Sequence, residues 1–222
     1  MIKQSCTFLT SLSLLLSANT FAYDLDMEAF EGEELALLKA AEKSSDNKLL
    51  MQAANLLIED SMYEENIDRG YEYMNKLAQS GEEKAIITLA DKYYYDEQYE
   101  KALAWYHKAE PSKDAYVLYS LAVMYFDGEG TPVDLKKGND YYLASAEAGY
   151  SDAMYQLAFS YDEGKGIAQD FSKSAYWFEQ AANLGDASAM YNLGISYLNG
   201  QGVEKSCPKA MQLFNNAIEE DE

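Results

Sequence analysis

The stretch that decides the fold is Ala153-Met-Tyr-Gln-Leu-Ala-Phe-Ser-Tyr-Asp-Glu-Gly-Lys-Gly166. It recurs without gaps as Val117-Leu-Tyr-Ser-Leu-Ala-Val-Met-Tyr-Phe-Asp-Gly-Glu-Gly130 and Ala189-Met-Tyr-Asn-Leu-Gly-Ile-Ser-Tyr-Leu-Asn-Gly-Gln-Gly202. The copies are 36 residues apart, so that leucines, tyrosines and paired glycines align in columns. The loop glycines of these columns are Gly128, Gly130, Gly164, Gly166, Gly200 and Gly202. A period of this length predicts stacked supersecondary units.

The spacing of apolar residues within each copy is helical. In the first half they fall at Ala153, Met154, Leu157, Ala158 and Tyr161, which places them on one face of a helix. Larger side chains, from Trp177 to Ala182, repeat the pattern in the second half. The first glycine of each pair suits a left-handed residue after the first helix, and Asp134 and Asp170 suit the N-cap of the second. Each unit is therefore predicted to be a helix hairpin.

Two shorter copies precede the three long ones if four residues are removed from the central loop. Leu57 and Leu89 then fall in the column of Leu121 at a spacing of 32. We expect two short units over residues 48–113 and three long units over 114–222. An acidic segment, 23–47, would add a capping helix. Because an amphipathic hairpin cannot bury its apolar face alone, the sequence predicts an all-α protein, an α-solenoid of about five stacked helix-turn-helix repeats.

The first 22 residues are predicted to be a cleavable signal peptide. Lys3 precedes an apolar run from Phe8 to Leu16, and Thr20-Phe21-Ala22 supplies small residues for cleavage. The run is too short to cross a bilayer, which needs about 20 apolar residues. We therefore expect a periplasmic or secreted protein of a Gram-negative bacterium, without a membrane span. Cys207 alone would remain after cleavage, so we expect no internal disulfide.

The charge of the chain restricts its partners. It carries 38 Asp and Glu residues against 17 Lys and Arg residues, a formal net charge of −21. Nucleic acids and anionic lipid surfaces attract basic proteins and repel one of this charge. We therefore expect no nucleic-acid partner, and favour another protein with a basic segment.

The residues also resemble a known family. The string Leu-(Ala/Gly)-x-x-Tyr-x-x-Gly-x-Gly, followed by Asp-x-x-Lys and by aromatic-x-x-x-Ala-Ala-x-x-Gly, is similar to the Sel-1-like repeat, a relative of the tetratricopeptide repeat. The likeness is most specific over 114–222, and the two short units look more like plain tetratricopeptide hairpins. The paired cysteines of the disulfide-rich subgroup are absent here. The resemblance implies a solenoid that binds other proteins.

Signals for catalysis are weak. The Gly-x-Gly triplets follow helices and lack the endings of nucleotide-binding loops. Ser45-Asp46-Asn47-Lys48 contains Ser-x-x-Lys and Ser-Asp-Asn, but penicillin-recognising enzymes carry these motifs on different elements and add a Lys-Thr-Gly strand. His107, with no second ligand at metal-binding spacing, is expected on a helix surface. We assign no catalytic, cofactor-binding or metal residues and expect no cofactor.

Two stripes on the first helices are candidate partner-binding sites. Small polar residues are expected to line the concave face: Ser120, Met124, Gln156, Ser160, Asn192 and Ser196. The other stripe holds the candidate hot spots Tyr119, Tyr155, Phe159 and Tyr191, and its counterparts in the short units include Asp91. Packing against the neighbouring unit is the favoured explanation of this second stripe.

The leading hypothesis is an exported, non-enzymatic scaffold or adaptor for protein–protein interaction. One alternative is a periplasmic immunity protein that neutralises a secreted toxin, such as a lipase effector. Another is a hydrolase acting on the cell wall or on β-lactams, with Ser45 as its nucleophile. The sequence leaves self-association undecided.

Overall fold

The computed structural model describes residues 30, 32–59 and 64–220, and in these residues all regular structure is helical. The all-α prediction is confirmed. The predicted signal peptide, 1–22, lies outside the described residues. The helices are α1 (Gly32–Ala41), α2 (Asn47–Glu59), α3 (Glu64–Gln79), α4 (Glu83–Tyr95), α5 (Tyr99–Ala109), the 3-10 helix η2 (Glu110–Ser112), α6 (Ala115–Asp127), α7 (Leu135–Glu147), α8 (Ser151–Glu163), α9 (Phe171–Ala182), α10 (Ala187–Asn199) and α11 (Cys207–Glu220).

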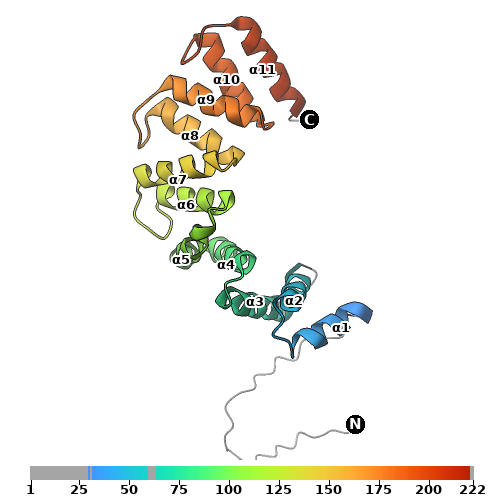
Figure 1. The fold of residues 1–222 in the computed structure, drawn as a ribbon. Coiled ribbons are helices and arrows are strands. Elements are labelled where there is room, and N and C mark those ends of the chain that lie inside the picture. The colour runs from blue at the N-terminus through green and yellow to red at the C-terminus, as the bar shows by residue number, and fades with distance from the viewer. Residues whose placement is uncertain (1–29, 31, 60–63, 221–222) are drawn as a thin grey trace, which may run out of the picture.

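Consecutive helices pair into hairpins, each packed on the next along a curved stack (Figure 1). The units, numbered one to five, are α2–α3, α4–α5, α6–α7, α8–α9 and α10–α11. We call α2, α4, α6, α8 and α10 the first helices and their partners the second helices. α1 packs on α2 at the N-terminal end of the stack.

The repeat columns occupy equivalent places in the long units. Leu121, Leu157 and Leu193 are all buried in the core. The lysine and tyrosine columns meet within each unit, because a lysine of the second helix lies over a tyrosine ring of the first. The distances from ammonium nitrogen to ring centroid are 3.9 Å for Lys137 and Tyr125, 5.1 Å for Lys173 and Tyr161, and 4.8 Å for Lys209 and Tyr197. Cation–π contacts thus account for two columns of the repeat.

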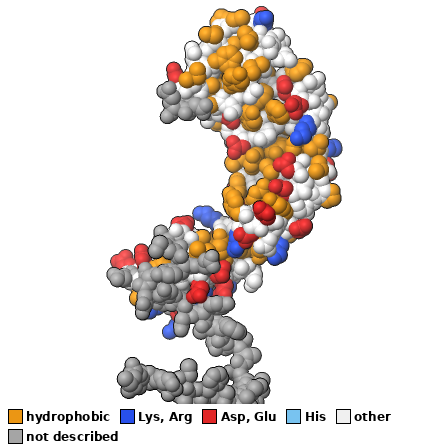
Figure 2. All heavy atoms as spheres, turned by 180° about the vertical axis from the view of Figure 1, so that it is seen from behind, with side chains coloured by type: hydrophobic (Ala, Val, Ile, Leu, Met, Phe, Trp, Pro, Cys, Tyr) orange, Lys and Arg blue, Asp and Glu red, His pale blue; other side chains and the backbone are white. Residues whose placement is uncertain are grey.

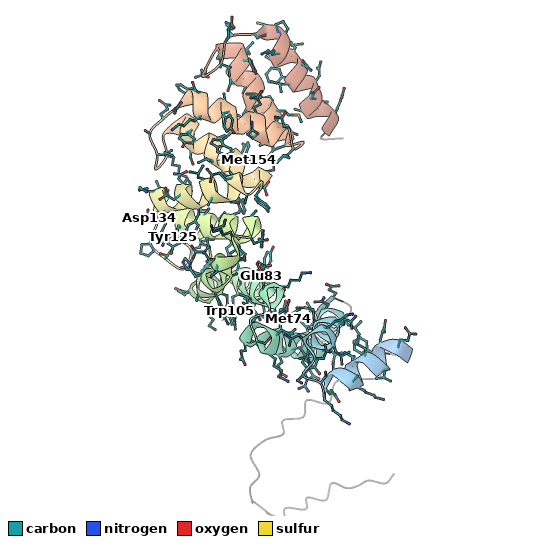
Figure 3. The ribbon with its side chains drawn as sticks, viewed as in Figure 1. Met74, Glu83, Trp105, Tyr125, Asp134 and Met154 are labelled. Carbon is teal, nitrogen blue, oxygen red and sulfur yellow. The ribbon has the colours of Figure 1, made fainter. Side chains whose placement is uncertain are left out.

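The loops within the long units close as the sequence predicts. Gly128, Gly164 and Gly200 end their helices with φ between 71° and 81°, in the left-handed region. The side chains of Asp134 and Asp170 accept hydrogen bonds from backbone N–H groups in the first turns of α7 and α9. Figure 3 shows Asp134 and Tyr125 side by side at this end of unit three, where the Asp134 N–H donates to the Tyr125 carbonyl at 2.8 Å.

The second glycine of each loop joins two units. Gly130, Gly166 and Gly202 also have positive φ, from 69° to 71°. A Cβ on Gly130 would lie 2.5 Å from the carbonyl oxygen of Tyr99, and one on Gly202 would collide with the carbonyl of Phe171. Tyr99 and Phe171 each begin the second helix of the preceding unit. The glycine therefore allows one unit's loop to lie directly on the backbone of its neighbour.

Two core clusters run along the stack and meet on α6. The N-terminal cluster extends from Phe30 to Met124, and the C-terminal cluster from Ala122 to Ala217. Viewed from behind, the stack is hollowed on one side, with hydrophobic side chains at the inner edge of its middle part and over its C-terminal end (Figure 2). The stack therefore offers an extended surface in addition to a continuous core.

Candidate functional site

The small polar stripe does not form an open surface. Ser120, Met124, Ser160 and Ser196 are buried, and only Gln156 and Asn192 are partly exposed. The hydroxyls of Ser120 and Ser196 donate to carbonyls of their own helices, at 3.0 and 3.1 Å. Met124 belongs to the N-terminal core cluster, together with residues of α5. The expectation of an open concave face is therefore wrong for the exposure of these four side chains. Ser120 and Asn192 nevertheless line cavities between helices, and a role of the stripe in partner binding stays a prediction.

The aromatic stripe is the more exposed of the two. Tyr191 and Phe159 are 55% and 39% exposed, while Tyr119 and Tyr155 are partly buried. The ring of Tyr119 lies 5.0 Å from that of Tyr150, and the ring of Tyr155 lies 5.7 Å from that of Phe178. The ring of Tyr191 also packs, 5.4 Å from that of Phe214, but 55% of the side chain stays exposed, so Tyr191 and Phe159 keep surface available for a partner. A role of any of the four in binding stays a prediction.

A cavity of about 230 Å³ opens between units two and three. We call it the tyrosine pocket, and its lining residues come from α4, α5 and α6: Tyr94, Tyr95, Tyr106, Tyr116, Tyr119, Ser120 and Val123. Tyr94 and Tyr95 end α4, while the four lining residues of α6 follow the spacing of one helix face. Tyr95, at 80% exposure, reaches furthest into solvent.

Asp91 of α4 organises the hydroxyl groups of this pocket. Its Oδ1 accepts hydrogen bonds from the hydroxyls of Tyr106 at 2.6 Å and Tyr116 at 2.8 Å. Burial and the bond to Asp91 raise the pKa of Tyr116 to about 12, and the same causes raise the pKa of Tyr106 further. Both phenols therefore stay protonated at neutral pH and hold the carboxylate in place.

A second cavity, of about 470 Å³, lies near the C-terminal end of the stack. Tyr155 and Tyr191 line it from α8 and α10, and Phe214 and Ile218 line it from α11. Tyr119, Tyr155 and Tyr191 are one repeat apart, so the two cavities share this column of the first helices. The second helix of the preceding unit, α5, closes the first cavity, and the second helix of the same unit, α11, closes the second. Together the two cavities make the aromatic stripe the candidate protein-binding surface.

A third cavity, of about 690 Å³, adjoins a polar network between units two and three. The ring nitrogens of His107 lie 2.8 Å from a Glu110 oxygen and 2.8 Å from the Tyr125 hydroxyl. Tyr141 donates to Glu110, and Lys137 donates to Tyr125. Burial acts to raise the pKa of Glu110, but the bonds from His107 and Tyr141 outweigh it and leave the pKa below its ordinary value. His107 is thus part of an inter-unit contact, and not the simple surface residue expected from sequence.

The tetrapeptide Ser45-Asp46-Asn47-Lys48 has a local role at the start of α2. Asp46 Oδ1 accepts the backbone N–H groups of Lys48 and Leu49, and the Asn47 amide donates to Ser80. Capping of a helix explains this composition. Within the described ranges, no three His, Cys, Asp or Glu residues are placed to hold a metal ion. None of the helices described has the length and apolar character needed to span a bilayer.

The tyrosine pocket was missed by sequence reasoning, although a signal for it exists. Asp91 stands in the column that holds Val123, Phe159 and Ile195 in the long units. This column is acidic in the two short units, where Glu59 aligns with Asp91, and apolar in the long ones, which indicates a local requirement for charge in the short units. What the sequence could not show is that tyrosines from α5 and α6 converge on it.

Structures of known proteins show the same architecture. A Sel1 repeat protein from Oxalobacter formigenes matches with a TM-score of 0.71 and 22% identity, over 85% of this chain and 80% of that one. YrrB, a tetratricopeptide protein with an unusual peptide-binding site, matches with a TM-score of 0.53 and 21% identity, over 83% and 92%. The protective antigen c5321 of uropathogenic Escherichia coli matches with a TM-score of 0.51 and 20% identity, over 90% of this chain and 50% of that one. At such identities the likeness establishes the fold alone.

The Sel1 repeat model matches five segments of the chain: 56–82, 92–110, 115–150, 151–186 and 187–222. The last three coincide with the long units. The first two fall in the short units, for which the sequence favoured plain tetratricopeptide hairpins. This repeat fold is typical of non-catalytic scaffolds that bind other proteins. Because the matched segments cover more than half of its length, the chain belongs to the Sel1 repeat family.

Proposed function

We propose that this protein is an exported, non-catalytic scaffold that binds a protein segment carrying basic residues along its aromatic stripe. The observation that carries the proposal is the pair of tyrosine-lined cavities, to which Tyr119 of α6 and its repeat equivalent Tyr191 of α10 both contribute. Tyrosine is enriched among interface hot spots because it buries a large, rigid ring at little entropic cost. The peptide-binding site of the similarly folded YrrB is consistent with such a role.

The basic character of the partner follows from the charge of the chain. A net charge of −21 speeds encounter with a cationic segment and disfavours an anionic one. The apolar run at the N-terminus, typical of an export signal, supports an extracytoplasmic partner.

Affinity capture from a bacterial envelope extract tests this function. We expect the tagged protein to retain a partner in 0.15 M salt. The Tyr191→Ala variant should bind this partner more weakly, by about tenfold or more. Tyr176→Ala is the matched control, because Tyr176 lies on the second helix α9 and is 53% exposed, close to the 55% of Tyr191. Retention should also fall in 1 M salt, where screening shortens the range of charge interactions to about 3 Å.

Two results would contradict the proposal. One is equal retention of the partner by both alanine variants, which would place the interface elsewhere. The other is retention unchanged in 1 M salt, which would remove the electrostatic contribution. The identity of a captured protein separates the finer roles: an envelope component assigns a scaffold, and a secreted toxin assigns immunity.

A further inference from the structure

The geometry points to the tyrosine pocket between α4 and α6 as a receptor for an arginine side chain of the protein partner. This inference rests on the proposed function, and it names the chemical group that one junction of the stack recognises. It follows from the orientation of the pocket hydroxyls, from the charge of Asp91 and from the aromatic lining.

Three of the hydroxyls that line the pocket have their hydrogens committed elsewhere. Those of Tyr106 and Tyr116 go to Asp91, and that of Ser120 goes to the backbone carbonyl of Tyr116. A hydroxyl has one hydrogen to donate and two lone pairs to accept with. These three groups therefore present only acceptors to a ligand. Three acceptors side by side favour a group that donates alone, and the positively charged side-chain groups of this kind are the guanidinium of arginine and the ammonium of lysine.

Asp91 adds a negative charge directly behind two lining phenols, since its Oδ1 lies 2.6 Å from the Tyr106 hydroxyl and 2.8 Å from the Tyr116 hydroxyl. Both of its hydrogen bonds come from neutral phenols, so they orient the carboxylate without neutralising it. The adjacent cation, Lys92, forms an ion pair with Asp96 at 2.6 Å and lies over the ring of Tyr71. Because Asp91 is partly buried, its field on a cation in the pocket is screened less than that of a surface carboxylate.

The aromatic lining favours guanidinium over ammonium. Tyrosine faces attract cations through the ring quadrupole, and a planar guanidinium can stack on such a face while it donates to several acceptors. An ammonium group is more strongly hydrated and loses more on entering a cavity of about 230 Å³. The Asp91 column holds Val123, Phe159 and Ile195 in the long units and Glu59 in unit one. In unit one, however, Met74 and Lys84 stand in the columns of Tyr106 and Tyr116, so the carboxylate with its two phenols occurs once among the aligned columns. One arginine would therefore fix the register of the bound segment.

Titration calorimetry of the purified protein with single-residue probes tests the inference. The probes are Nα-acetyl-arginine amide, Nα-acetyl-citrulline amide, which replaces guanidinium by a neutral urea of the same shape, and Nα-acetyl-lysine amide. We expect the arginine probe to bind about tenfold more tightly than the citrulline probe, and more tightly than the lysine probe. Asp91→Asn, which keeps an oxygen acceptor for the two phenols, should abolish most of the preference for arginine over citrulline.

Asp162→Asn is the matched control, because it removes the same charge from α8, away from the pocket, and should leave the preference unchanged within twofold. Tyr95→Ala is a second pocket variant that the fold tolerates, since the side chain is largely exposed, and it should weaken arginine binding about threefold. Equal binding of arginine and citrulline would overturn the inference, as would equal effects of the two Asp→Asn variants. Equal or tighter binding of lysine would overturn the assignment of arginine.

Failure of this inference is distinguishable from failure of the proposed function. If the pocket does not recognise arginine, the arginine and citrulline probes bind equally, while capture of the partner still depends on Tyr191. If the stripe does not bind a protein, capture fails while the purified protein still separates arginine from citrulline.

Discussion

Gly202→Ala is expected to lower the free energy of unfolding by about 3 kcal/mol, although it adds only one methyl group. Gly202 has a φ of 70°, and a Cβ at this position would collide with the carbonyl of Phe171 at the start of α9. About 1 kcal/mol of the loss comes from forcing alanine into the left-handed region. The remainder comes from separating the loop of unit five from the backbone of unit four.

Gly200→Ala isolates these two contributions. Gly200 lies in the same loop with a φ of 74°, but its added Cβ would approach no closer than 3.3 Å, to the side chain of Lys205. We expect a loss of about 1 kcal/mol from the backbone conformation alone. Urea unfolding followed by circular dichroism measures both variants. Equal losses would show that the second glycine is not needed for contact between units.

Leu157→Ala is expected to cost about 2–5 kcal/mol, the range for a large-to-small change in a packed core. Leu157 is fully buried on α8 within the C-terminal core cluster, and its repeat equivalents Leu121 and Leu193 are buried as well. Truncation removes apolar contacts and leaves a cavity that the flanking helices can fill only in part. Because each unit contacts only its neighbours, the loss should be greatest in unit four and the units next to it.

Leu184→Ala serves as the control for this substitution, because Leu184 follows α9 and is 57% exposed. A surface change of this kind should stay within about 0.5 kcal/mol. Thermal and urea unfolding of the two variants give the comparison. Similar stabilities of Leu157→Ala and Leu184→Ala would mean that the leucine column does not form the core of the stack.

The fold could be predicted because the long repeats have the same residue types at their core positions and at their helix ends. The leucine column predicts the buried face, the first glycine of each loop predicts the end of the first helix, and the N-cap aspartates predict the start of the second. The structure confirms these roles at Leu157, Gly164 and Asp170. Local propensity and stacking favour the same structure at these positions, and such agreement allows a fold to be predicted from sequence.

The burial of four residues of the polar stripe has a physical reason that the sequence pattern does not show. A serine in a helix can satisfy its hydroxyl by donating to a carbonyl one turn earlier, as Ser120 and Ser196 do. It can then be buried without a partner on another element. Burial of Met124 depends on how unit three lies on α5, and no column within a single repeat records that arrangement.

The tyrosine pocket required the structure because its parts come from different units. Asp91 and Tyr94 belong to unit two, whereas Tyr116 and Ser120 belong to unit three. Their distances in sequence carry no information on the direction of the hydroxyl groups. The hydrogen bonds from Tyr106 and Tyr116 to Asp91 show this direction. The inferred site for an arginine side chain depends on it.

Hydroxyl-radical footprinting of tyrosines, with and without the captured partner, tests the central claim most directly. Tyr95 and Tyr191 belong to the two cavities on the first-helix side, and Tyr176 lies on the second helix α9. All three side chains are exposed enough to react in the free protein. The account predicts that the partner protects Tyr95 and Tyr191 and leaves Tyr176 reactive. Protection of Tyr176 with Tyr95 and Tyr191 unchanged would contradict it.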